Sequence, residues 1–244
     1  MPADEQPIPS VWARPRRERE QPALSREHIV REAVRLLDEE GIDALSMRRL
    51  GGRLGAGATS IYRHIASKDE LIELAVDEVY GELVLPDVGD PAGWRAGVAQ
   101  VAHRLRATIL RHPWLAAKLG EAGLSYLGPN VLRRSEHLLA LFEAAGFGLR
   151  EADRAVNAVT AYVLGISTGE AAWRSMVARS GQSEQEWADR LWPAAERAVE
   201  GYPRLRTLYA ELRGGDPAED NEAAFEYGLD RILDGLESRL RATG

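Results

Sequence analysis

Residues 46–64 combine basic, hydroxyl and glycine residues in an order that suits contact with nucleic acid. The segment contains two short helical stretches separated by a glycine-containing turn, which is the arrangement of a helix-turn-helix. Gly55 can take the left-handed backbone conformation that so tight a turn needs. Leu50, Leu54 and Ile61 would form the small core that fixes the angle between the helices. The second helix could then enter a major groove, while basic residues and helix N-termini hold phosphates.

Other kinds of chemistry lack the residues that they need. The chain has no cysteine, which excludes disulfides, thiolate nucleophiles and cysteine-ligated metals. It contains no nucleophile elbow, no phosphate-binding loop and no pair of histidines four residues apart. His103 and His112 are nine residues apart, and no set of histidines and carboxylates has metal-ligand spacing. The sequence therefore predicts a protein that is not an enzyme and has no cofactor and no metal site.

Composition and charge agree with a DNA-binding N-terminal segment followed by a more acidic remainder of the chain. Of the 244 residues, 45% are hydrophobic and 28% are charged, as in ordinary soluble globular proteins. No apolar run reaches the length of a membrane span, and the N-terminus lacks the apolar core of a secretory signal, which predicts a cytoplasmic protein. The net charge is −7, yet the segment from Ser10 to Glu70 holds 12 basic and 10 acidic residues. The acidity therefore lies further along the chain.

The hydrophobic pattern predicts helices throughout and no strands, because apolar residues recur at spacings of three and four. Ser25, Ser46 and Ser67 are expected N-caps, and Ser67 with Glu70 forms a capping-box pattern. Pro113 is expected to end the helix that begins near Trp94. The predicted helices cover residues 25–41, 46–55, 58–64, 67–83, 94–111, 130–145, 150–178, 184–199, 203–213 and 217–242.

These elements predict three parts of the chain. Residues 1–22 are rich in proline and arginine and are expected to form a flexible arm. Residues 23–70 form the helix-turn-helix domain, and residues 71–244 form a larger helical domain. The arm has two interpretations, a solubilising tail or a minor-groove contact, because arginine-rich arms are attracted to the deep negative potential there. The arginines concerned are Arg14, Arg16 and Arg17.

The sequence resembles the TetR family of repressors. The resemblance is carried by the runs Gly41–Leu50 and Leu54–Leu71, above all by Ile61-Tyr62-x-His64 followed by Ser67-Lys68-x-Glu70-Leu71. It is strong over about residues 24–83, and a weaker similarity to the tetracycline-repressor C-terminal domain follows. The resemblance implies a three-helix DNA-binding domain, followed by a domain for ligand binding and dimerisation.

The resemblance also assigns the residues that would contact DNA. Arg48 matches a position on the second helix that contacts a base or phosphate, and Lys68 matches a phosphate-contacting lysine. An arginine can bind guanine O6 and N7, while hydroxyl, phenol and imidazole groups reach bases or phosphates. The positions that match the recognition helix are Ala58, Thr59, Ser60, Tyr62 and His64.

Two apolar stripes, within residues 150–178 and 217–242, have the alternating spacing of helices that pack on partner helices. They suit either the chain's own core or, as the resemblance implies, a four-helix dimer interface. The residues assigned to that interface are Val159, Val163, Ile166, Phe225, Leu229, Ile232 and Leu236.

A sensor pocket is implied by the resemblance, and aromatic or amphipathic side chains of the middle helices are its candidate lining. Each of them could instead be core or surface. The candidates are His103, Trp114, Tyr126, His137, Phe142, Tyr162 and Trp173.

The resulting hypothesis is a dimeric repressor that binds a palindromic operator in double-stranded DNA and is released by a largely apolar small-molecule inducer. A dimer suits this task because two recognition helices must meet half-sites about one DNA turn apart. The alternative is an activator or architectural DNA-binding regulator without a small-molecule ligand.

Overall fold

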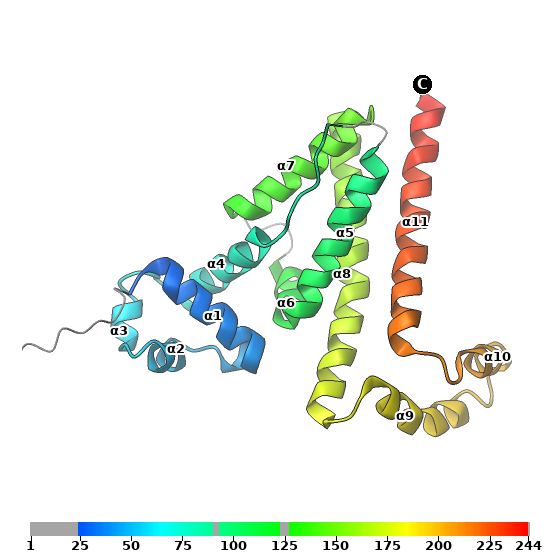
Figure 1. Cartoon of the computed structure of the whole chain (residues 1–244), viewed down its shortest axis with the longest axis horizontal. Coiled ribbons are helices and arrows are strands. Elements are labelled where there is room, and N and C mark those ends of the chain that lie inside the picture. Colours follow the sequence, from blue (N-terminus) through cyan, green and yellow to red (C-terminus); the bar gives the residue numbers. More distant parts are fainter. Residues whose placement is uncertain (1–23, 90–92, 123–126, 244) are drawn as a thin grey trace, which may run out of the picture.

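The computed structural model of the protein describes residues 24–89, 93–122 and 127–243. In these ranges the chain forms eleven α-helices and one short 3₁₀ helix, and no strand, which confirms the predicted all-α fold. The first four α-helices lie at one end of an elongated molecule, and the longest helices run side by side through the rest (Figure 1). No helix among the described residues has both the length and the apolar character needed to cross a bilayer.

The N-terminal helices begin at the serines that the sequence indicated. Helix α1 (Arg26–Glu40) is capped by Ser25, whose Oγ accepts a hydrogen bond from the backbone N–H of His28 at 3.2 Å. Helix α2 (Met47–Arg53) is capped in the same way by Ser46, and a 3₁₀ helix (Ile42–Ala44) joins the two. Helix α3 (Ala58–Ile61) is shorter than predicted, because residues 62–64 form a turn.

The turn between α2 and α3 depends on two glycines. Gly55 has φ +62°, the left-handed conformation that the sequence predicted for it. Gly51 is buried in α2, and a Cβ atom built there would lie 2.7 Å from the backbone oxygen of Ala56. The backbone N–H of Ala56 donates to the Gly51 carbonyl at 2.8 Å, which holds the turn against the helix. Gly51 thus permits the close approach that sets the angle of α3.

Replacing Gly51 by alanine should destabilise the helix-turn-helix by about 1–3 kcal/mol, because the rigid backbone at Ala56 must move to admit the new methyl group. Gly52→Ala is the matched control, since no atom lies within 4 Å of a Cβ at that exposed position. There alanine should raise stability by up to about 1 kcal/mol through its better helix propensity. Urea unfolding of both variants measures the difference, and equal effects at the two positions would refute the argument.

Helix α4 (Lys68–Gly81) connects the two parts of the molecule. Ser67 Oγ accepts from the backbone N–H of Glu70 at 3.0 Å, as predicted. The Glu70 carboxylate, however, accepts from the backbone N–H of Ala66 at 2.6 Å rather than from that of Ser67, so the second half of the capping box is displaced by one residue. Helix α4 packs on both α1 and α7 (Pro129–Ala144). The predicted domain boundary, between residues 70 and 71, therefore falls within one continuous helix.

One helix of the C-terminal part was not predicted. Helix α5 (Trp94–Arg111) ends as expected before Pro113, but that proline begins another helix, α6 (Pro113–Ala122). The first position of a helix tolerates proline because its N–H would have no helical partner there. The remaining helices agree with the predicted ranges. They are α7, α8 (Leu149–Ser180), α9 (Glu184–Ala198), α10 (Pro203–Leu212) and α11 (Pro217–Thr243).

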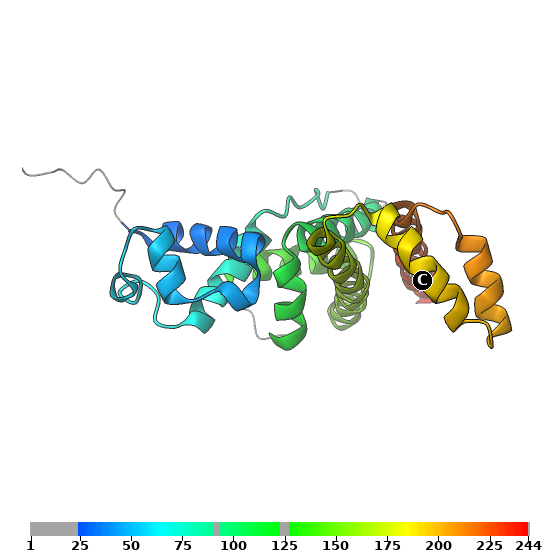
Figure 2. The same ribbon diagram turned by 90° about the horizontal axis from the view of Figure 1, so that it is seen from below.

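Helix α8 is central to the C-terminal part, because α5, α6, α7 and α11 all pack against it. Apolar side chains of these helices and of α1 and α4 form one continuous core. Helices α9 and α10 contribute no buried side chain. They lie at the end of the molecule opposite the N-terminal helices, as seen from below in Figure 2 (yellow and orange).

Candidate DNA-binding and ligand-binding sites

The described side chains that were predicted to contact DNA belong to α2, α3, the turn after α3 and the start of α4, and all of them are at least partly exposed. Arg48, Thr59, His64 and Lys68 are exposed, and Tyr62 has 52% of its surface exposed although it is a large aromatic residue. Ala58 and Ser60 are partly exposed. By contrast, Ile61 is fully buried, as predicted for the small core.

Ion pairs divide the arginines of this region into two groups. Arg26 pairs with Glu70 at 2.8 Å, Arg49 pairs with Glu40, and Arg53 pairs with Glu32, Glu39 and Glu40. No such pair holds Arg48, Arg63 or Lys68 within the described ranges. These three cations therefore keep their charge available for an external anion. Sequence reasoning missed Arg63, although it stands between Tyr62 and His64 and is exposed.

Some predicted contacts cannot be placed. Arg14, Arg16 and Arg17 of the arm, and Tyr126 of the predicted pocket, lie outside the described residues.

The predicted dimer stripes need a correction. Val159, Val163, Phe225 and Leu229 are at most 2% exposed in a single chain, because they fill the core between α8, α11 and their neighbours. They have no free surface to offer to a second subunit. Ile166, Ile232 and Leu236 pack against the same core but stay partly exposed.

The described candidates for the ligand pocket do not converge on one site. Phe142 is fully buried against Trp94 and Phe147, and Tyr162 donates its hydroxyl hydrogen bond to the carbonyl of Phe225 at 2.8 Å. His103 packs on the same Phe225 ring as Tyr162, and the other candidates lie elsewhere. Trp114 packs near α1, His103 faces α11, His137 borders a shallow depression beside Leu85, and Trp173 lines a cavity between α8, α9 and the start of α11.

A different cavity lies between α4, α6, α7 and α8. Its volume is about 390 Å³, within the range of small-molecule sites. Tyr80 of α4, Leu119 of α6 and Val156 of α8 contribute apolar surface, and Arg134 of α7 contributes a guanidinium. None of the aromatic candidates that the structure describes lines this cavity, whose wall is mainly aliphatic.

Helix α4 is tied to the cavity wall through Asp77. Its Oδ1 accepts hydrogen bonds from the backbone N–H groups of Asn130 and Val131, at 2.9 and 3.1 Å. The Asn130 side chain donates to Asp77 Oδ2 at 3.0 Å. A carboxylate of one helix thus caps the N-terminus of another, where unpaired N–H groups and the helix dipole favour negative charge. Helices α4 and α7 are therefore joined by these hydrogen bonds as well as by packing.

A second link joins α1 to the C-terminal part. Asp38 Oδ1 accepts from Trp114 Nε1 at 2.8 Å and lies 2.7 Å from His112 Nδ1. The other ring nitrogen of His112 is 3.3 Å from Glu82, which also pairs with Arg111. Burial alone would lower the pKa of His112, but hydrogen bonds and charges from Asp38 and Glu82 outweigh it and raise that pKa above its ordinary value.

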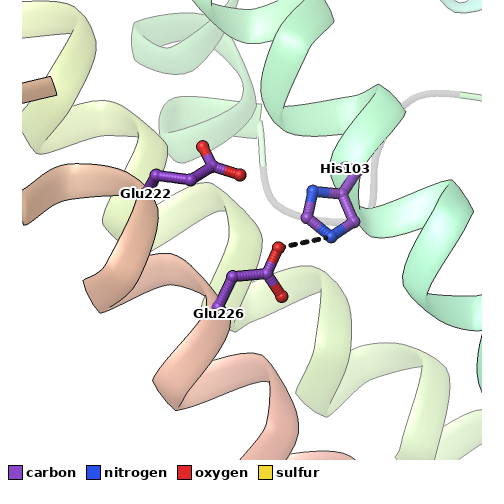
Figure 3. A group of neighbouring side chains, drawn as sticks. All are labelled: His103, Glu222 and Glu226. Atoms are coloured by element: carbon purple, nitrogen blue, oxygen red, sulfur yellow. Dashed lines mark ion pairs between the residues drawn. The ribbon is translucent and has the colours of Figure 1, made fainter. Parts of the chain in front are cut away.

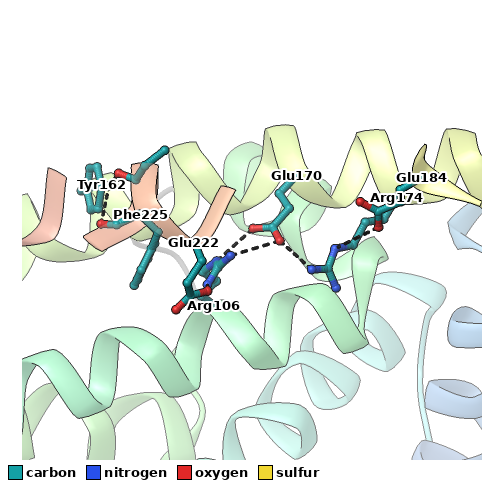
Figure 4. A network of polar contacts seen from close by, with 8 residues as sticks. Arg106, Tyr162, Glu170, Arg174, Glu184, Glu222 and Phe225 are labelled. Carbon is teal, nitrogen blue, oxygen red and sulfur yellow. Dashed lines mark hydrogen bonds and ion pairs between the residues drawn. The ribbon is translucent and has the colours of Figure 1, made fainter. Parts of the chain in front are cut away.

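A buried ion-pair network joins α5, α8 and α11 (Figure 4). Arg106 donates to both carboxylate oxygens of Glu170, at 2.9 and 3.1 Å, and also pairs with Glu222. Arg174 pairs with Glu170 from the next turn of α8 at 2.8 Å. The Arg106 and Glu170 side chains are 8% and 3% exposed, so this pair lies in the core.

Three potential metal ligands lie next to this network. The ligand atoms of His103, Glu222 and Glu226 are all within 4.8 Å of one another, and His103 Nε2 is 3.0 Å from Glu226 (Figure 3). Spacing along the sequence did not reveal this set, because His103 belongs to α5 while the two glutamates belong to α11, far away in the sequence. Arg106 already binds Glu222 and lowers its pKa through that hydrogen bond. The arrangement suits a salt-bridge cluster in which the Arg106 guanidinium, rather than a metal ion, is the cation that balances Glu222.

In comparison with known proteins, the N-terminal and C-terminal parts of the chain match models of the same family. Residues 29–75 match the model for bacterial regulatory proteins of the tetR family, and residues 85–240 match the tetracyclin repressor-like C-terminal domain. An HTH-type transcriptional regulator of Saccharopolyspora erythraea is 37% identical over 231 residues, covering 93% of this chain and 91% of the relative. The HTH-type transcriptional repressor DrrR1 of Streptomyces coeruleorubidus is 33% identical, covering 88% of this chain and 78% of the relative.

A solved structure resembles the whole fold. Apo ActR from Streptomyces coelicolor superimposes with a TM-score of 0.73 at 27% identity, covering 91% of this chain and 98% of that one. ActR has also been solved in complex with actinorhodin, and that structure gives a TM-score of 0.72 at 28% identity, covering 90% and 99% of the two chains.

Proposed function

Because the chain belongs to the TetR family of bacterial regulatory proteins, we propose that it is a repressor that binds a palindromic operator as a dimer and is released by a small molecule. The observation that carries this proposal is the group of exposed cations on the helix-turn-helix. Arg48, Arg63 and Lys68 have no ion pair among the described residues, whereas their neighbours Arg49 and Arg53 are neutralised by glutamates. Unpaired cations at this surface favour phosphate binding.

The exposed face of α8 supports a dimer. Its side chains are small at Ala158, Gly165 and Ala172, which lets a second helix approach closely. Ile232 and Leu236 of α11 add partly exposed apolar surface. A symmetric pair of subunits would present two helix-turn-helix units, which matches a palindromic site.

Helix α4 is the proposed route from ligand to DNA. Tyr80 lies at the cavity, Asp77 caps the cavity-lining helix α7, and Lys68 begins α4 beside the DNA-binding surface. A ligand that fits a shifted position of α7 better would move α4 and change the spacing of the two reading helices. Only differential affinity shifts such an equilibrium, and a tenfold loss of operator affinity needs about 1.4 kcal/mol of coupling. The ActR–actinorhodin complex supports a small-molecule site in a protein of this fold.

Three single variants, Arg48→Ala, Arg63→Ala and Lys68→Ala, should each bind the operator about ten times more weakly, because each lacks one charged contact. The plot of log operator affinity against log salt concentration should also become less steep, by the amount that corresponds to about one phosphate contact per subunit. Arg204→Ala is the control, because this exposed arginine of α10 lies at the opposite end of the molecule (Figure 1).

The measurement is footprinting and titration on the DNA upstream of the protein's own gene, with light scattering to give the oligomeric state. A monomer both with and without DNA would contradict the proposal, as would three variants that bind as tightly as the control. Operator binding that no small molecule weakens would favour the regulator without a ligand.

A further inference from the structure

The cavity between α4, α6, α7 and α8 has one polar feature that its apolar wall does not explain. Arg134 of α7 is 5% exposed, and its Nη2 donates to Thr160 Oγ1 of α8 at 3.0 Å. Its Nε is buried and has no hydrogen-bond partner. Within the described part of the chain, no carboxylate lies within ion-pair distance of this guanidinium.

The contrast with Arg106 shows what is missing. Both arginines are buried, but Arg106 binds both oxygens of Glu170 and a second carboxylate, Glu222. Arg134 has one hydrogen bond, to the neutral hydroxyl of Thr160, and lies near the Tyr80 phenol. Burial lowers the pKa of Arg134, the direction expected for a desolvated cation that no anion compensates. A buried charge without a partner is costly, and buried charges are ordinarily paired. An anionic ligand in the cavity would supply the missing partner.

We propose that the small molecule bound in this cavity carries a carboxylate beside an apolar body and that Arg134 binds this carboxylate. The planar guanidinium presents paired N–H donors that match the two oxygens of a carboxylate. The apolar body would lie against side chains such as Leu119, Val131 and Leu164. This inference rests on the proposed function only in taking the cavity as the site of the inducer.

The test compares aromatic acids with their primary amides, which have nearly the same shape but no charge. Calorimetry of the full-length protein would use 2-naphthoate with 2-naphthamide, and anthracene-2-carboxylate with its amide. Each acid should bind at least ten times more tightly than its amide, which corresponds to about 1.4 kcal/mol. In the Arg134→Met variant the acid should bind no better than the amide, and the affinity for the amide should stay unchanged. Arg134→Lys should keep part of the preference, because it keeps the charge but loses the paired donors.

The unliganded variant gives a second, independent readout. If only a bound ligand compensates the charge of Arg134, then Arg134→Met should leave the urea midpoint of the unliganded protein unchanged or raise it, because the variant lacks an uncompensated buried charge. A structural arginine would show the opposite change. Equal affinity of acid and amide for the wild-type protein, or no binding of either, would overturn the inference, and so would strong destabilisation by Arg134→Met.

The operator assay separates this inference from the proposed function. Acids that bind through Arg134 but leave DNA affinity unchanged would support the site and count against its role as inducer site. Release of the operator by neutral compounds alone would support the proposed function and count against a carboxylate site at Arg134.

Discussion

Replacing Arg106 by methionine should destabilise the folded protein by about 3–5 kcal/mol, the range for removing one partner of a buried ion pair. The Glu170 side chain is 3% exposed and would keep only Arg174 from the neighbouring turn. Glu222 matters less, because its side chain is 52% exposed and water can replace the arginine there. The loss should therefore come mainly from the uncompensated charge of Glu170.

The double variant Arg106→Met with Glu170→Leu separates this cause from simple loss of packing. It removes both buried charges and keeps apolar volume, so its stability should return to within about 1 kcal/mol of the wild type. Urea unfolding at one fixed protein concentration measures all three proteins, since stability of an oligomer depends on concentration. If the single variant loses no more than an exposed ion pair contributes, the network does not hold α5 to α8.

Asp38→Ala should destabilise the protein by about 2 kcal/mol, because the buried His112 ring and the Trp114 indole lose the carboxylate that both contact. Asp38→Asn should cost less, since an amide oxygen still accepts these hydrogen bonds. Without the negative charge, however, the pKa of His112 should fall from its raised value, and an NMR titration of the ring measures that fall directly.

The pH dependence follows from the raised pKa of His112. Its protonated form is stabilised in the folded state, so the contribution is complete below the ordinary value of pH 6.5 and is lost as pH rises through the raised pKa. The stability difference between wild type and Asp38→Asn should therefore be greatest near about pH 5.5 and should shrink toward about pH 9. Glu82, which contacts the other nitrogen of this ring and pairs with Arg111, stays unchanged in both proteins. A difference that grows with pH would contradict this assignment, and His112→Gln provides the non-titrating control.

The sequence predicted the fold well, because helix caps and breakers are local signals. Ser25, Ser46 and Ser67 all cap helices where expected. Pro113 misled the prediction of α6, because the same residue ends one helix and begins the next.

Periodicity predicted which side chains are buried but not what covers them. The stripe containing Val159 and Phe225 has the same pattern in a monomer core as at a dimer interface, and here it belongs to the core. The cavity between α4, α6, α7 and α8 was not predicted for a related reason. The prediction relied on aromatic residues, but Phe142 packs in the core and Trp173 lines a different cavity, and the distinctive group at this cavity is Arg134. One signal was present, since Arg134 precedes buried Leu138 by one turn and so stands on the apolar face of its helix.

Helix α4 has a consequence for building chimeric regulators. Exchange of DNA-reading heads between relatives needs a junction that breaks few contacts, and a cut between residues 70 and 71 would divide α4 after its first turn. A transplanted head that kept all of α4 would have to bring a counterpart of Asp77 to cap the recipient's α7. It would also need a counterpart of Asp38 to meet His112 and Trp114. Asp38 and Asp77 are therefore two carboxylates whose hydrogen bonds across this junction a graft must preserve if the head is to pack on the recipient's body as it does in this chain.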